Sequence, residues 1–165
     1  NPGNLSHLQS QVLMKPHIVI DARLYGPKHT GLGRYTKNLL LNLPAGKFNY
    51  TLLIYPELAN EIKKDLGAKF NYVITNIRHY TPAEQIRLPL LLHSLRPDLV
   101  HFTHFSKPIL YWGKSVVTVH DLIPLVAPAA TPRALKRRLF PLYRRLMHEV
   151  GARADRIDLL ARHRR

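Results

Sequence analysis

The sequence predicts an α/β fold: a Rossmann-like, doubly wound, mainly parallel sheet with helices on both faces. Three observations support this prediction. Short apolar runs alternate with helix-like runs from residue 17 onward. The first run, 17–22, is rich in β-branched residues, as in a strand that is covered on both faces. A loop containing Gly31 and Gly33 then leads into a helical pattern that stops at Pro44 and Gly46.

The remaining elements are predicted from the same patterns. Pro89 lies inside the helix predicted over 83–95 and is expected to kink or split it. In that helix, Ile86, Leu90 and Leu91 are expected to face the sheet. Further strands are predicted over 50–55, 70–77, 99–102 and 115–119, and helices over 57–66 and 83–95.

Length and composition limit the class of protein. The chain has 165 residues, which predicts one domain with a real core, and it has no cysteine, which excludes disulfides and thiolate metal sites. Its longest apolar runs are shorter than a membrane span. We therefore expect a soluble, cytoplasmic chain. Residues 1–14 are polar without a sustained period, and they predict a flexible N-terminal extension.

The formal net charge of +15 is concentrated near the C-terminus. Residues 131–165 contain eleven Lys or Arg against three acidic residues, a balance of +8. Within them, Pro132–Val150 has the pattern of a basic amphipathic helix. Such a helix either lies on an anionic membrane surface or packs on the core with its charges solvated, and both alternatives stay open.

The glycine-bearing helix start is a candidate binding site. Unpaired backbone N–H groups and the positive end of the helix dipole favour an oxygen-rich or anionic ligand, and glycine allows close approach. Gly31-Leu32-Gly33 is not the full dinucleotide fingerprint, so a nicotinamide cofactor is disfavoured. The alternative is a tight turn without a ligand.

Polar side chains also follow two predicted strands. His120 and Asp121 come after 115–119, and His104 follows 99–102. Ligands of open α/β sheets bind outside the carboxyl ends of strands, so these residues are expected to share one crevice with the glycine turn. An imidazole there can bond a sugar hydroxyl, and the alternative is that His120 and Asp121 only cap a turn. His101 and His104 lack a common face and a third ligand, so no metal site is predicted.

Three sequence phrases, Ile20–Arg23, Thr30–Thr36 and Val117–Pro124, carry a resemblance to a known family. They resemble the N-terminal domain of retaining glycosyltransferases of the GT-B fold, family-4 type (glycosyltransferase group 1). This resemblance implies that His120 and Asp121 face the donor sugar and take part in catalysis, and that a nucleotide-sugar is the donor, without a metal or other cofactor. It also implies that the cleft is lined by Gly31, Leu32, Gly33, Arg34 and Tyr35, with His104 at the same edge.

The resemblance covers residues 15–157 and then breaks off. Asp158–Arg162 stands where the family has an apolar strand, so 158–165 is expected to be a basic tail, truncated or rejoined. The family's nucleotide-binding second domain is not found in the sequence. We therefore expect the acceptor-side half of an enzyme that is inactive without a C-terminal domain in cis or in trans.

The resemblance further implies a glycan or lipid-linked acceptor and a cytoplasmic location, peripheral at the inner membrane face. The alternative from another class is a non-catalytic basic module that binds anionic lipid headgroups or nucleic acid. Nucleic acid is disfavoured because no recognisable binding motif accompanies the charge.

Overall fold

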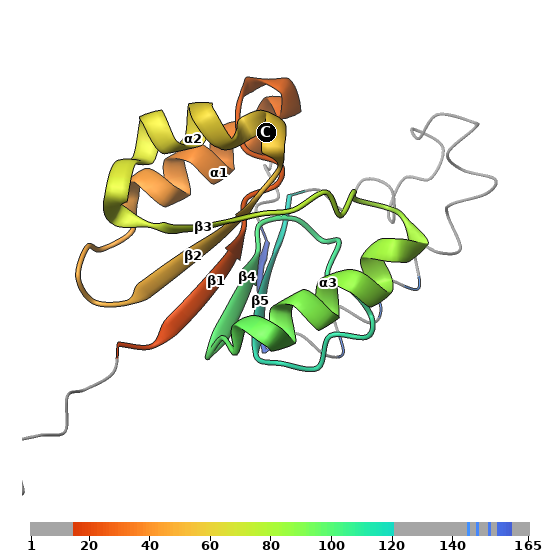
Figure 1. The fold of residues 1–165 in the computed structure, drawn as a ribbon. Coiled ribbons are helices and arrows are strands. Elements are labelled where there is room, and N and C mark those ends of the chain that lie inside the picture. Colours follow the sequence, from red (N-terminus) through yellow and green to blue (C-terminus); the bar gives the residue numbers. More distant parts are fainter. Residues whose placement is uncertain (1–14, 121–144, 146–147, 149–151, 153–154, 160–165) are drawn as a thin grey trace, which may run out of the picture.

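The described part of the chain is built around one parallel sheet (Figure 1). The computed structural model describes residues 15–120, 145, 148, 152 and 155–159. Six strands lie in the order β3-β2-β1-β4-β5-β6, and all pairs are parallel. The strands are β1 His17–Asp21, β2 Asn49–Ile54, β3 Asn71–Ile74, β4 Leu99–Phe102, β5 Ser115–Val119 and β6 Arg156–Leu159.

Helices cover both faces of this sheet. Helices α1 (Thr30–Asn42) and α2 (Ala59–Leu66) lie on one face and α3 (Pro82–Leu95) on the other (Figure 1). Alternate strand residues supply two separate cores: Ile20 and Leu52 pack on the α1–α2 side, and Val19 and Leu53 on the α3 side. The predicted Rossmann-like α/β fold is confirmed. Short 3-10 helices are η1 Pro27–His29, η2 Pro56–Leu58 and η3 Gly67–Lys69.

The third strand is shorter than predicted. It ends at Ile74, whereas the sequence suggested a strand over 70–77. The Thr75 hydroxyl accepts a hydrogen bond from the backbone N–H of Ile77 at 3.2 Å, which turns the chain away from the sheet. The carbonyl of Ile77 is then free of the strand ladder and accepts from the buried Arg23 side chain at 2.7 Å.

The predicted sheet-facing side of α3 is wrong. Ile86 and Leu90 are 58% and 64% exposed, and only Leu91 of the expected set is partly buried. The buried stripe instead begins with a carboxylate, Glu84, and continues one turn at a time through Leu88 and Leu92. The sequence pattern did not reveal this stripe, because its first residue is charged and a charged residue is expected to be exposed. Pro89 lies within the continuous helix and does not split it.

The last strand extends beyond the expected end of the domain. Asp158 and Leu159 pair with Thr118 and Val119 of β5, although the sequence placed them in the basic tail. Parallel pairing uses backbone groups that every residue except proline carries, so the polar Asp158 does not prevent it. The division into residues 15–157 and 158–165 otherwise stays a prediction.

Several predictions concern residues outside the described part of the chain. They are the extension 1–14, Asp121, residues 160–165 and most of Pro132–Val150, within which Arg145 and His148 are described as helical and exposed. None of the helices in the described ranges has the length and apolar character that crossing a bilayer requires.

Candidate functional site

The candidate site lies where the strand order reverses. From β1 the sheet grows outward through β2 and β3 on one side and through β4 to β6 on the other, and ligands of such sheets bind at the carboxyl ends beside this switch point. Asp21 ends β1, and Thr103 follows β4 directly. The Thr103 hydroxyl donates to the Asp21 carbonyl at 2.7 Å, so the two strand ends are tied together there.

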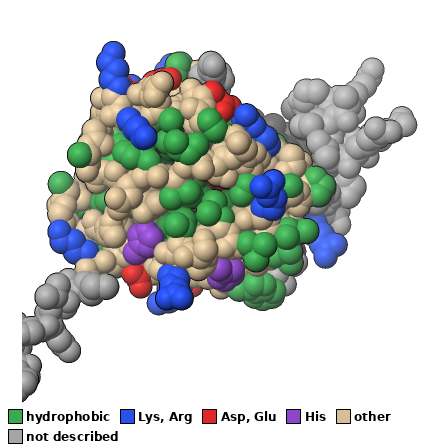
Figure 2. Space-filling view, viewed as in Figure 1, with side chains coloured by type: hydrophobic (Ala, Val, Ile, Leu, Met, Phe, Trp, Pro, Cys, Tyr) green, Lys and Arg blue, Asp and Glu red, His purple; other side chains and the backbone are tan. Residues whose placement is uncertain are grey.

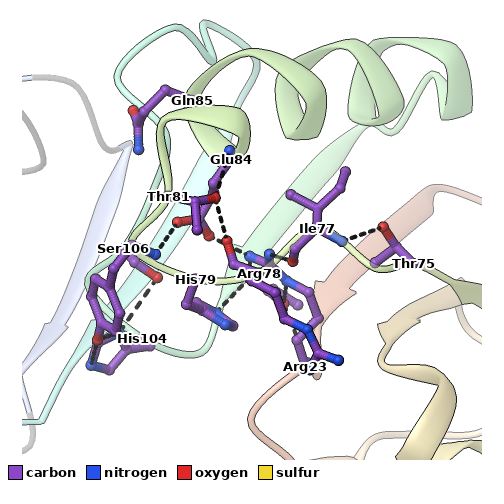
Figure 3. Close-up of polar contacts among 12 residues, drawn as sticks. Arg23, Thr75, Ile77, Arg78, His79, Thr81, Glu84, Gln85, His104 and Ser106 are labelled. Carbon is purple, nitrogen blue, oxygen red and sulfur yellow. Dashed lines mark hydrogen bonds and ion pairs between the residues drawn. The ribbon is translucent and has the colours of Figure 1, made fainter.

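A buried arginine fills the space behind this edge. Arg23 is completely buried and reaches from the end of β1 toward the first turn of α3 (Figure 3). Its guanidinium donates to both Asp21 carboxylate oxygens, at 2.8 and 2.6 Å, and to Glu84 Oε1 at 2.8 Å. A further bond reaches the Ile77 carbonyl. We call Asp21, Arg23 and Glu84 the buried triad.

The two carboxylates of the buried triad differ in protonation behaviour. Burial alone raises the pKa of a carboxyl group, but the charge and hydrogen bonds of Arg23 outweigh burial at Asp21 and lower its pKa to about 2. At Glu84 burial is the larger effect, and its pKa is raised despite Arg23. The difference follows from geometry, since Asp21 receives a bidentate contact and Glu84 a single one.

The buried triad also fixes the segment between β3 and α3. Glu84 Oε2 accepts from the backbone N–H of Tyr80 at 2.8 Å, and the Thr81 side chain caps α3 by accepting from the Glu84 N–H at 3.2 Å. Tyr80 has a φ of 62°, in the left-handed region that non-glycine residues seldom adopt. The ion pair therefore holds a strained residue that projects its ring, 61% exposed, at the edge of the sheet.

Six rings form a continuous series along this edge, which we call the ring belt. It consists of Tyr55, His79, Tyr80, His104, His120 and Tyr35 in spatial order. Neighbouring ring centroids are separated by 5.9, 6.0, 6.0, 6.5 and 4.7 Å. The belt passes across the ends of β2, β4 and β5 and reaches α1. It brings together three of the residues predicted from the sequence, His104, His120 and Tyr35.

Two imidazoles of the belt, those of His79 and His104, are kept neutral by their surroundings. Burial lowers the pKa of His79 to about 4, and its partial compensation by Asp21 at 3.8 Å does not restore it. Burial, followed by repulsion from His79 and His120, lowers the pKa of His104 to about 3. His79 Nδ1 is hydrogen-bonded to the Tyr55 hydroxyl at 2.7 Å. At neutral pH these rings therefore provide hydrogen-bonding groups without charge.

His120 is oriented by the residues around it. Its Nε2 lies 2.8 Å from the Thr103 carbonyl, which can only accept, so the proton resides on Nε2. In the neutral ring Nδ1 then carries the lone pair. The Tyr35 ring meets it edge-on, and the Tyr35 hydroxyl is 3.1 Å from Thr118 Oγ1, which also bonds His101 Nε2 at 2.9 Å. These contacts place Tyr35 of α1 beside the end of β5, and the crevice expected between the glycine turn and His120-Asp121 stays a prediction.

The two glycines of the predicted turn play different parts. Gly33 packs directly on the Gly26 backbone, where an added Cβ would overlap the Gly26 carbonyl oxygen. Gly31 is exposed, with open space around the position of a Cβ. Gly33 is therefore explained by close helix–loop packing. Leu32 is half-buried and Arg34 exposed on the same turns, and their binding roles stay predictions.

Sequence reasoning missed the buried triad and half of the ring belt. Arg23 ends the phrase Ile20–Arg23, which carried the family resemblance but assigned no role to its side chain, and His79 lies in a loop without a recognisable motif. Glu84 had a signal, because Thr81-Pro82-Ala83-Glu84 has the capping-box pattern of a helix start. Its carboxylate does not close the box on Thr81 but turns to Arg23 and to the Tyr80 backbone.

Within the described ranges, no three His, Cys, Asp or Glu side chains are arranged to hold a metal ion.

Comparison with known protein families now adds to this geometry. The family model described as Glycosyltransferase Family 4 matches residues 29–157, which is most of the chain. The chain belongs to glycosyltransferase family 4. No curated protein matches it significantly. In this family-4 chain the matched range includes α1, β4, β5 and all six residues of the ring belt.

Replacing Arg23 should destabilise the family-4 domain strongly. Arg23→Met leaves two carboxylates buried without their cation, which is expected to cost about 3–5 kcal/mol of unfolding free energy. The milder Glu84→Gln keeps an acceptor oxygen and should lose less. Urea denaturation at neutral pH measures both. The control is Lys37→Met, which breaks a partly exposed pair with Asp65 and should cost at most about 1 kcal/mol. Equal losses in all three variants would contradict a special role of the triad.

The two glycines provide a matched pair. Gly33→Ala should lower stability by about 1–3 kcal/mol because the methyl group meets backbone that cannot move aside. Gly31→Ala has open space and should raise stability by a few tenths up to about 1 kcal/mol through higher helix propensity. Thermal or urea unfolding distinguishes them, and a stable Gly33→Ala protein would show that the helix–loop contact is looser than described.

Stability should fall in mild acid. His79 and His104 have folded pKa values of about 4 and 3, below the ordinary 6.5 of the unfolded chain, so between these values the unfolded state binds more protons. Each group therefore lowers the unfolding free energy by up to about 1.4 kcal/mol for each pH unit below its unfolded pKa. Urea midpoints measured from neutral pH downward should show this loss, and His104→Gln should reduce its slope. An unchanged slope would mean that His104 is not held neutral.

Proposed function

We propose that the chain is the acceptor-side half of a retaining GT-B glycosyltransferase, which transfers a sugar from a nucleotide-sugar to a glycan or lipid-linked acceptor. The ring belt is the single observation that carries this proposal. Phenol and neutral imidazole groups each donate and accept hydrogen bonds, and their faces and edges suit the C–H surfaces of a pyranose. A neutral polyhydroxylated ligand matches such an edge better than a phosphate does.

The arrangement of charge supports the acceptor side in particular. The guanidinium of Arg23 lies behind the belt with its donors committed to Asp21, Glu84 and a backbone carbonyl. It cannot grip a diphosphate without breaking these bonds. Stabilisation of the departing nucleoside diphosphate then falls to donors outside the ring belt, such as those of a nucleotide-binding domain in cis or in trans.

His120 is proposed to act directly on the substrate. With its proton fixed on Nε2, the Nδ1 lone pair can accept a hydrogen bond from a sugar hydroxyl. Tyr35 and Thr103 restrict the ring from two sides, which gives the preorganisation that sugar transfer needs. Asp121, next in the chain, is proposed to orient the sugar through another hydroxyl. Gly31, Leu32 and Arg34 are proposed to line the same cleft from α1.

Ligand binding by the 165-residue chain tests this function. Saturation-transfer NMR and thermal shift are measured with a panel of nucleotide-sugars, methyl glycosides and free nucleoside diphosphates. We expect at least one sugar-bearing ligand to bind, and His120→Ala to weaken that binding about ten-fold through loss of a hydrogen bond. His93→Ala, which removes an exposed histidine on α3, is the matched control and should bind normally.

Two outcomes would reject the proposal. The first is that no sugar in the panel binds the wild-type chain. The second is that free nucleoside diphosphates bind as well as the nucleotide-sugars and His120→Ala changes neither, which would indicate a nucleotide site elsewhere.

A further inference from the structure

Tyr80 combines a strained backbone with an exposed aromatic ring. Within the described ranges five residues have a positive φ, and three of them are glycines: Gly26, Gly46 and Gly67. A fourth, Arg96 with a φ of 47°, stands directly after α3, where a left-handed residue is a common helix end. Tyr80, with a φ of 62°, lies before α3 and ends no helix. Its conformation therefore needs another explanation.

The backbone contact of Tyr80 does not need the side chain. Its N–H donates to Glu84 Oε2 at 2.8 Å, a bond that every residue except proline can make. Glycine would make the same bond without the steric cost that the left-handed region imposes on a bulky residue. The ring is 61% exposed, so it buries little surface in exchange for this cost. Strained residues cluster at functional positions, and here the exposed ring is the part that the backbone does not explain.

Aromatic neighbours orient this ring. Its centroid lies 6.0 Å from that of His104 at an interplanar angle of 86°, and 6.1 Å from that of Phe105. The Tyr80 hydroxyl is hydrogen-bonded to the His104 imidazole, at 3.3 and 3.4 Å from its two nitrogens. The segment that carries Tyr80 runs from β3 across the sheet to the start of α3 (Figure 1). The ring is thus held at the same sheet edge as His120.

The surroundings of the ring are poor in unpaired charge at neutral pH. Burial lowers the pKa of His79 to about 4 and the pKa of His104 to about 3. Arg78 lies over the Tyr55 ring, and its guanidinium is paired with Glu57. On the face drawn in Figure 2, the Lys and Arg side chains are spread apart and do not gather into one patch. These surroundings suit a neutral ligand better than a phosphate.

We propose that Tyr80 is a specificity-determining residue that stacks on a neutral pyranose unit of the acceptor. The face of an aromatic ring carries partial negative charge, which attracts the C–H groups of a sugar, and a ring held in place before binding loses little freedom. Centroid spacings of 6.5 and 6.0 Å lead from His120 through His104 to Tyr80, so sugars on His120 and Tyr80 would be neighbours along the belt. This assignment rests on the proposed function, and it selects an acceptor that presents a sugar unit.

Ligand binding by the full chain tests the role of the ring. Methyl glycosides carry one neutral sugar ring and no phosphate, so they serve as probes of the acceptor in saturation-transfer NMR. Tyr80→Ala should weaken their binding about ten-fold, whereas Tyr80→Phe, which keeps the ring, should weaken it less than about three-fold. Nuclear Overhauser contacts between the Tyr80 ring protons and the sugar C–H groups should show the stacking directly.

The backbone strain has a separate readout. Glycine is ordinarily less stabilising than alanine, but at a left-handed position this order reverses. Tyr80→Gly should therefore have a thermal midpoint about 2–4 °C above that of Tyr80→Ala, while both variants bind methyl glycosides equally weakly. Arg96→Gly is the matched control, because Arg96 is the other non-glycine residue with a positive φ in the described ranges and lies outside the ring belt. This control should keep or raise the midpoint and bind normally.

Two results would overturn the role of Tyr80 and leave the proposed function standing. The first is nucleotide-sugar binding that depends on His120, together with methyl glycosides that either do not bind or bind equally well to Tyr80→Ala. The second is a Tyr80→Gly variant less stable than Tyr80→Ala, which would mean that the backbone is not strained. A wild-type chain that binds no sugar at all would overturn both proposals.

Discussion

The structure depends on one buried arginine between two carboxylates. Arg23 lies at the point where the strand order of the parallel sheet reverses. Its side chain joins the end of β1, the segment after β3 and the first turn of α3. A charge in this position is costly to desolvate, and it is retained only because its hydrogen bonds are satisfied on several sides. The triad thus fixes three chain segments relative to one another at the edge where ligands of this fold bind.

The Arg23 charge is paired inside the protein, and this explains why the ring belt beside it is poor in formal charge. Asp21 is ionised against Arg23, and the histidines nearby are too buried to protonate at neutral pH. The part of the ring belt from Tyr55 to His104 therefore presents dipoles and aromatic surface in place of formal charge. Such an edge is suited to a neutral ligand rich in hydroxyl groups, which is the basis of the function proposed above for this family-4 domain.

The sequence predicted the parts that follow from local pattern. Strands β1, β4 and β5 were found from their apolar runs, and their parallel pairing then placed His104 and His120 at one edge. The face of α3 was not found, because its buried stripe starts with Glu84 and a charged residue looks solvent-exposed until its partner is known. Arg23 and His79 could not be found either, since each acquires its role only through residues far away in the chain. The length of β3 was missed for the same reason: the Ile77 carbonyl leaves the strand for Arg23.

The central claim is that the candidate site is a neutral edge with a fixed hydrogen-bonding direction. Imidazole nitrogen chemical shifts of the selectively labelled chain, measured by NMR at neutral pH, test this claim most directly. The account predicts uncharged rings for His79 and His104 and the tautomer of His120 that carries its proton on Nε2. Protonated His79 or His104, or a His120 proton on Nδ1, would contradict it.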